Sequence, residues 1–274
     1  MNPSEISPAA PELSVVIPAY NEAGTIGRML LGVTRALPEV SKQIVIVDDY
    51  SSDGTTEWLR RNLAQAEGLW RSMSIDGDGE IHLSADGSQN SGGFSFTVLF
   101  HQRNRGKGAA LRTGFARTLG QVVVIQDADL EYDPSDWAQM LPLITERQVA
   151  DVVYGSRFYG RPHRSLYFHH YLGNRLISFL FNIFYNQMLS DIEVCYKMFT
   201  REVLKTLMLT SNDFGIEIEL SAQIALARRW RIYEVGIGYY GRTYDEGKKI
   251  NWRDGLKALV YLVKFRARPS RSFH

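Results

Sequence analysis

The sequence has a single cysteine and almost no net charge, and each of these features argues against a particular class of protein. Cys195 is the only cysteine among 274 residues, so a disulfide within the chain is impossible and a reducing, cytoplasmic setting is the simplest interpretation. The formal net charge is only +1. Because binding to a nucleic-acid backbone usually accompanies a strong basic excess, this balance argues against a nucleic-acid partner.

Long hydrophobic runs are also missing. No stretch reaches the ~18 consecutive apolar residues that a membrane-spanning helix needs. The first residues, MNPSEISPAAPE, lack the basic-then-apolar order of a signal peptide. If this protein works at a membrane, we expect it to act from the surface.

What is present is a globular composition, 45% hydrophobic and 22% charged, with a regular alternation of strand and helix patterns. Residues 1–12, rich in Pro, Ser and Ala, are expected to be a loose tail. Short apolar strands are predicted at LSVVIPA, KQIVIVDD, FSFTVLF, QVVVIQDA and DVVYGSR. Such an order predicts an α/β fold with a mainly parallel sheet, which binds ligands at the carboxyl ends of its strands.

Three further segments depart from this alternation. Residues 67–93 are rich in Gly, Ser and Asp and predict a surface loop or a small hairpin, with DGDGE as a turn because the spacing of a calcium loop is incomplete. Residues 164–190 are aromatic and apolar, which predicts a helix packed on the domain or lying at a membrane surface. The C-terminal amphipathic helix and the basic tail at 267–274 suit either anionic lipid or simple packing with a solvated end.

An acidic ladder follows one of the predicted strands. In VVVIQDADLEYDP, four apolar residues run into Asp127, Asp129, Glu131 and Asp133. Carboxylates two residues apart at a strand end can share one ion, and hard oxygen ligands favour Mg²⁺ or Mn²⁺. A pair of this kind alone is also typical of turn-capping carboxylates.

Basic residues in glycine-bearing segments give the ladder a possible partner. RNRGKGAALRTG places Lys107 among glycines that let backbone N–H groups approach an anion, and Arg157 and Arg242 follow later. Carboxylates for a metal together with cations for phosphates indicate a nucleoside diphosphate compound as the ligand.

This chain resembles the family 2 glycosyltransferases of the GT-A fold, and most of all their dolichyl-phosphate mannosyltransferase, or polyprenyl-phosphate glycosyltransferase, branch. The motifs that carry the resemblance occur in the family's order: VVIPAYNE, IVIVDDYSSDGT, RNRGKGAALRTG, VVIQDADLEYDP, VVYGSRF, DIEVCYKMFTREVL and YYGRTYDEGKK. It spans about residues 13–266 and implies a single GT-A domain there, with 67–93 inserted. It also implies transfer of a hexose from a donor such as GDP-mannose or UDP-glucose to a polyprenyl phosphate, with inversion.

The resemblance also implies roles for individual residues. It assigns nucleotide-sugar binding to Pro18, Tyr20, Glu22, Val47, Asp49, Lys107, Asp127, Ala128, Asp129, Arg157, Arg242 and Lys248. The metal, Mg²⁺ or Mn²⁺, falls to Asp127, Asp129 and Glu131, where relatives often have Gln in place of Glu131. Catalysis falls to Asp127, Asp129, Arg242 and Lys248, and the acceptor phosphate to Arg157, Arg175 and Ser178.

Two other functions remain open at this stage. A glycosyltransferase with a hydroxyl acceptor would need a general base, for which Asp191, Glu217 and Glu219 are the candidates. A non-catalytic nucleotide-sugar-binding protein is the other, although the intact acidic and basic motifs argue against it. For a phosphate acceptor, we expect a peripheral protein on the cytoplasmic face that meets its lipid through residues 164–190 and the basic C-terminus.

Overall fold

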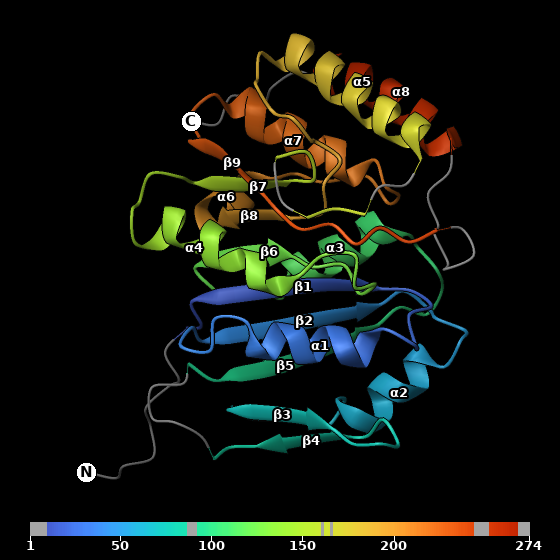
Figure 1. Cartoon of the computed structure of the whole chain (residues 1–274), viewed down its shortest axis with the longest axis vertical. Helices are drawn as coiled ribbons and strands as arrows, with labels where there is room; N and C mark the ends of the chain where they lie inside the picture. The colour runs from blue at the N-terminus through green and yellow to red at the C-terminus, as the bar shows by residue number, and fades with distance from the viewer. Residues whose placement is uncertain (1–9, 87–91, 160–161, 165–166, 244–251, 268–274) are drawn as a thin grey trace.

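The computed structural model describes residues 10–86, 92–159, 162–164, 167–243 and 252–267. Its centre is a seven-stranded sheet in the order β5-β2-β1-β6-β8-β7-β9 (Figure 1). The strands predicted from the sequence are β1 (Leu13–Ala19), β2 (Lys42–Asp48), β5 (Phe94–Phe100), β6 (Val122–Ile125) and β7 (Val152–Ser156). Neighbouring strands are parallel except at β8, so the predicted α/β class with a mainly parallel sheet is confirmed.

Two strands of this sheet were not predicted. β8 (Lys197–Thr200) runs antiparallel between β6 and β7, and β9 (Ile232–Gly236) pairs in parallel with β7 at the edge. β8 has only four residues and directly precedes a helix, so its apolar pattern is too short to separate from that of its neighbours.

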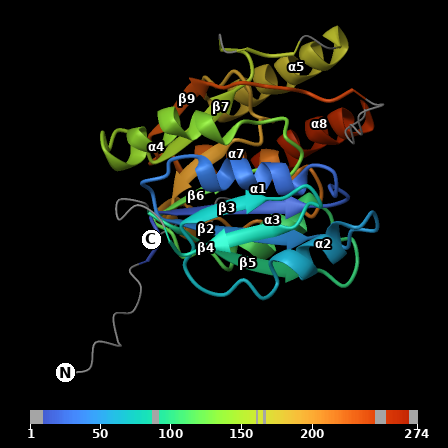
Figure 2. The same cartoon turned by 60° about the horizontal axis from the view of Figure 1, so that its bottom comes forward.

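Eight α-helices are described around the sheet. They are α1 (Ile26–Arg35), α2 (Thr55–Asn62), α3 (Lys107–Phe115), α4 (Trp137–Thr145), α5 (Phe168–Tyr185), α6 (Arg201–Thr206), α7 (Ile216–Ala227) and α8 (Trp252–Ala267). A short 3-10 turn, η1 (Pro134–Asp136), leads into α4. Figures 1 and 2 show α5 and α8 side by side at one end of the molecule, and both contact α7. Among the described helices, none is long and apolar enough to span a bilayer.

Two segment predictions change in detail. The helix expected over 164–190 is the shorter α5, which ends where Asn186 takes a left-handed conformation (φ 51°). Within 67–93, the hairpin alternative holds, since β3 (Ser72–Ile75) and β4 (Ile81–Ser84) pair antiparallel. At its turn, Asp76 accepts hydrogen bonds from the backbone N–H groups of Asp78 (3.0 Å) and Glu80 (2.9 Å).

The order of the strands determines where a ligand can bind. From β1 the chain proceeds outward to β2 and β5, and then returns to place β6 on the other side of β1. In open α/β sheets, such a reversal leaves a crevice beyond the carboxyl ends of the two central strands. In this chain that crevice is bordered by the residues after Ala19 and after Ile125, which include the acidic ladder.

Candidate functional site

A cavity of about 1230 Å³ opens at this crevice and extends to α5 and α8. Most of the residues predicted for the site line it: Pro18, Tyr20, Glu22, Asp49, Lys107, Asp127, Ala128, Asp129, Glu131, Arg157 and Arg242. At its far end the walls come from the first turns of α5, such as Phe168 and Tyr171, and from α8, such as Ala258 and Tyr261. One cavity therefore joins the acidic ladder to a pair of helices.

Three carboxylates of the ladder meet basic residues from distant parts of the chain, while Asp133 accepts from the backbone N–H of Ser135. The Lys107 ammonium lies 2.8 Å from an Asp127 carboxylate oxygen. Arg242 donates to Asp129 at 2.8 Å, and its backbone N–H donates to Glu131 at 2.8 Å. These contacts offset the cost of removing the carboxylates from water.

Arg242 is the centre of this cluster. Its guanidinium also donates to both carboxylate oxygens of Glu22, at 3.1 Å and 3.2 Å. Burial opposes its charge, but the carboxylates of Asp129, Glu22 and Glu131 outweigh burial and raise the pKa of Arg242 above its ordinary value. The segment after β1 and the C-terminal part of the chain around Arg242 are thus held together at the site.

The carboxylates of the ladder still repel one another. Burial, followed by the charges of Asp127 and Glu131, raises the pKa of Asp129 to about 7, even though Arg242 acts in the opposite direction. This excess of negative charge suits a divalent cation. Within the described ranges, however, no three His, Cys, Asp or Glu side chains converge as a ligand group, and Glu131 instead accepts from the Tyr239 hydroxyl at 2.9 Å. The residues thus fit a metal held by one or two carboxylates, with water and phosphate oxygens completing its shell.

Asp49 lines the cavity, but its carboxylate is already hydrogen-bonded within the protein. Its carboxylate accepts from the backbone N–H groups of Arg105 (2.9 Å) and Gly106 (2.7 Å) and from His101 (2.6 Å). It therefore holds the loop before α3 in place. Val47, predicted beside it, is fully buried, lies against α3 near Gly114 and does not line the cavity.

The Lys107 ammonium also belongs to a second network of charged side chains. The Lys107 ammonium is 3.1 Å from one oxygen of Glu217, and the buried Lys197 is 2.5 Å from the other. Glu217 thus joins α7 to the ladder through Lys107 and to the start of β8 through Lys197. Sequence reasoning missed Lys197, because nothing in DIEVCYK distinguishes a buried, paired lysine from a solvated one.

Arg157 borders the cavity with its charge already balanced. It forms a two-point ion pair with the fully buried Asp191, at 2.6 Å and 2.7 Å. Its guanidinium also lies 5.3 Å from the ring centre of Tyr239. An anion at this point would face a neutral pair and not a free cation.

The other two residues predicted for the acceptor phosphate lie outside the cavity lining. Ser178 is buried and its hydroxyl accepts from the backbone N–H of Ile192 at 3.2 Å. Arg175 is exposed and donates to the carbonyl of Ser190 at 3.3 Å. Lys248 falls outside the described residues.

The three candidate general bases are engaged elsewhere. Asp191 holds Arg157, and Glu217 holds Lys107 and Lys197. Glu219 is fully buried and accepts from the backbone N–H groups of Thr210 (2.9 Å) and Ser211 (2.7 Å). In this arrangement each of them stabilises the fold.

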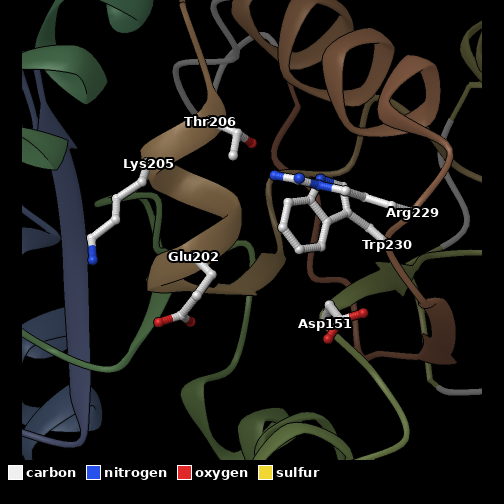
Figure 3. A pocket seen from close by; sticks show the side chains of 6 residues that line it. All are labelled: Asp151, Glu202, Lys205, Thr206, Arg229 and Trp230. Carbon is white, nitrogen blue, oxygen red and sulfur yellow. The ribbon is translucent and has the colours of Figure 1, made fainter. Parts of the chain in front are cut away.

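A second hollow, of about 600 Å³, lies at the amino ends of β7 and β9, the opposite edge of the sheet from the ladder. It is lined by Asp151, Glu202, Lys205, Thr206, Arg229 and Trp230 (Figure 3). Asp151 is paired with Arg231 at 2.8 Å, and the Arg229 guanidinium lies 4.3 Å from the ring centre of Trp230. Because ligands of this fold class bind at the carboxyl ends of strands, we place the functional site in the larger cavity.

Comparison with known proteins identifies the family of this chain. The model of the family described as "Glycosyl transferase family 2" matches residues 14–70 and 74–208. The low-salt glycan biosynthesis hexosyltransferase Agl6 of Haloferax volcanii is 29% identical over 94% of this chain. The dolichyl-phosphate beta-glucosyltransferase of Saccharomyces cerevisiae is 26% identical over 93% of this chain, and the undecaprenyl-phosphate 4-deoxy-4-formamido-L-arabinose transferase of Aeromonas hydrophila is 28% identical over 92%. This chain spans 54%, 74% and 65% of these relatives, respectively.

Solved structures support the fold. Glucosyl-3-phosphoglycerate synthase from Mycobacterium tuberculosis, in complex with Mn²⁺, uridine diphosphate and phosphoglyceric acid, superposes with a TM-score of 0.65 at 18% identity. The alignment covers 95% of this chain and 80% of that chain. The same protein with Mg²⁺ and uridine diphosphate gives a TM-score of 0.61 at 20% identity. The predicted GT-A fold is therefore confirmed.

Proposed function

Because this chain belongs to glycosyl transferase family 2, we propose that it transfers a hexose from a nucleoside diphosphate sugar to a polyprenyl phosphate, with inversion at the anomeric carbon. The donor is of the GDP-mannose or UDP-glucose type. The observation that carries this proposal is the single cavity that joins the acidic ladder and its cations to the apolar helices α5 and α8. The names of the relatives, which are polyprenyl-phosphate sugar transferases, point in the same direction.

The end of the cavity that contains the acidic ladder has the charged groups needed to bind the diphosphate of a donor. Lys107 and Arg242 lie beside the ladder, and each is held by a carboxylate that a metal would compete for. Asp127 and Asp129 would hold Mg²⁺ or Mn²⁺, which when bound offsets the charge that develops on the departing nucleoside diphosphate. Lys107 and Arg242 then donate to phosphate oxygens, which strengthens the same stabilisation.

The acceptor in this proposal needs no protein base. A phosphate monoester has a second pKa near ~6, so it is largely dianionic at neutral pH. The enzyme has to align it with the anomeric carbon and exclude water. This suits a site in which Asp191, Glu217 and Glu219 are all engaged in structural contacts, and it makes a hydroxyl acceptor the less favoured alternative.

The outer surface of the two helices supports a membrane location. On α5 the exposed apolar side chains recur at helical spacing: Phe168, Leu172, Leu176, Phe179 and Ile183. On α8 they are Leu256, Val260 and Val263, with the exposed basic residues Lys264 and Arg266 nearby. An apolar face with basic neighbours suits an anionic lipid surface, and a chain with one cysteine suits the cytoplasmic face.

The proposal is tested by assaying transfer with a panel of GDP- and UDP-sugars, with Mg²⁺ or Mn²⁺, and with a short polyprenyl phosphate. We expect one donor to yield a glycolipid in a metal-dependent reaction, with a loss of at least a hundredfold in Asp129→Asn. Glu146→Asn, a change at an exposed residue on α4's C-terminal side, is the control and should retain activity. Binding of a donor without any transfer by the wild type would support the non-catalytic alternative instead.

A further inference from the structure

One carboxylate on the cavity wall differs from the others. Those described above are each hydrogen-bonded or ion-paired, and Asp213, a further one, accepts from the Tyr261 hydroxyl at 2.9 Å. Glu193 also lines the cavity, yet it has no hydrogen bond or ion pair with any residue in the described part of the chain. Its side chain is only half-buried, so water in the cavity still reaches it. A ligand that fills the cavity would displace this water, which is costly unless the ligand donates hydrogen bonds to the carboxylate. Its missing partners are therefore expected to come from a ligand.

Glu193 lies between the two ends of the cavity. Two residues after it, Cys195 also lines the cavity and has its thiol beside Asp127. Two residues before it, Asp191 holds Arg157. Glu193 is therefore placed between the ladder, where a diphosphate would bind, and the part of the cavity that leads to α5.

The surroundings of Glu193 indicate the chemistry of its ligand. Burial raises the pKa of its carboxyl to about 7, with Arg157 opposing the shift and Asp191 adding to it. Arg157, the cation that acts most strongly on Glu193, is already neutralised by Asp191, so it is not free to bind a phosphate beside Glu193. A carboxylate repels an anion but accepts hydrogen bonds from two neighbouring hydroxyl groups at once. A neutral, hydroxyl-bearing ring fits this position better than a phosphate does.

We propose that Glu193 binds hydroxyl groups of the sugar carried by the nucleotide, and so helps to determine which sugar is transferred. This inference rests on the function proposed above, because it requires a nucleotide-sugar donor. It also predicts discrimination against donors with a carboxylate on the ring, since such a sugar would place like charges together.

The test separates binding of the sugar from binding of the nucleotide. The dissociation constants of a nucleoside diphosphate and of its sugar conjugate are measured for the wild type, Glu193→Gln and Glu193→Ala. We expect Glu193→Ala to weaken binding of the nucleotide sugar by at least tenfold and Glu193→Gln to weaken it less, with the nucleoside diphosphate unchanged within twofold in both. Discrimination between donors that differ at one hydroxyl group should fall in parallel. Glu146→Gln is the matched control and should change neither constant.

The possible outcomes keep this inference distinct from the proposed function. An equal change in both dissociation constants, or no change in either, would overturn the role of Glu193 in sugar binding. A lower kcat with unchanged donor affinity would overturn it too, because that is the behaviour of a general base for a hydroxyl acceptor. If the wild type binds the nucleoside diphosphate but transfers the sugar from no donor, the proposed function itself fails.

Discussion

Arg242 compensates more negative charge than any other single residue discussed at the site. Its side chain reaches Glu22 and Asp129, and it lies beside Glu131, so removing its charge leaves these carboxylates facing one another. We expect Arg242→Gln to lower the free energy of unfolding by about 3 kcal/mol in metal-free buffer. Urea denaturation, with and without Mn²⁺, checks this. Added Mn²⁺ should restore more stability in the variant than in the wild type, because a divalent cation can replace the missing charge.

Arg231 offers the matched control for this change. It also forms a two-point ion pair, with Asp151, but at an exposed position. Since solvent screens exposed pairs, Arg231→Gln should cost much less stability than Arg242→Gln. Equal losses in the two variants would contradict the account of Arg242 as the cation of a buried acidic cluster.

Lys42 leads to a prediction about pH. It is buried at the start of β2, where its ammonium donates to the carbonyls of Leu37 (2.8 Å) and Val40 (3.1 Å). Burial lowers the pKa of Lys42 from 10.5 to about 8, although Glu39 and Glu12 oppose the shift. Between these two values the unfolded chain binds more protons than the folded one, so the stability of the fold rises with pH across this window.

The comparison with a variant isolates this effect from other groups that titrate in the same range. We expect the wild type to gain on the order of 1–3 kcal/mol, relative to Lys42→Met, as the pH rises from about 8 to about 10.5. Denaturant unfolding of both proteins over this range measures the difference. A constant difference in stability would show that Lys42 does not carry the predicted linkage.

At the scale of the element, the loop before α3 depends on a glycine. Gly106 has φ +90°, and a Cβ atom at this position would lie 2.4 Å from the carbonyl oxygen of Asn212. Gly106→Ala should therefore lower stability by about 2 kcal/mol and weaken nucleotide binding, because the loop that Asp49 holds would have to move. Gly173→Ala in α5 is the contrast, because nothing lies within 4 Å of its added Cβ and the helix should gain about 0.5–1 kcal/mol. Thermal unfolding of the two variants distinguishes these effects, and a stable Gly106→Ala would refute the argument.

The pair α5 and α8 carries the prediction about the membrane. We expect a double variant, Leu176→Asp with Val260→Asp, to bind anionic liposomes at least tenfold more weakly than the wild type. Leu119→Asp, at another exposed leucine outside these helices, should bind as the wild type does. Co-sedimentation at low salt measures all three. If the double variant binds liposomes as well as the wild type does, the exposed apolar face of α5 and α8 is not the membrane-binding surface.

At the scale of the whole molecule, the sequence predicted the strands whose apolar runs end in polar motifs, because parallel strands buried on both faces stand out clearly. It did not predict the pairs that build the site, such as Lys107 with Glu217 or Arg157 with Asp191, because those residues meet only once the chain has folded. Val47 shows a related limit. A fully buried strand has no alternation of polar and apolar residues, so its sequence cannot tell which side chains face the ligand and which face α3.

The central claim is that the acceptor is a lipid phosphate, and one measurement tests it most directly. The protein is incubated with its donor and metal, and with either a short polyprenyl phosphate or the matching polyprenyl alcohol, and the products are identified by mass spectrometry. We predict a glycosyl phosphate lipid from the phosphate and no product from the alcohol, since the acids considered as bases are occupied in ion pairs and hydrogen bonds. Transfer to the alcohol, or donor hydrolysis without transfer to either lipid, would contradict the account.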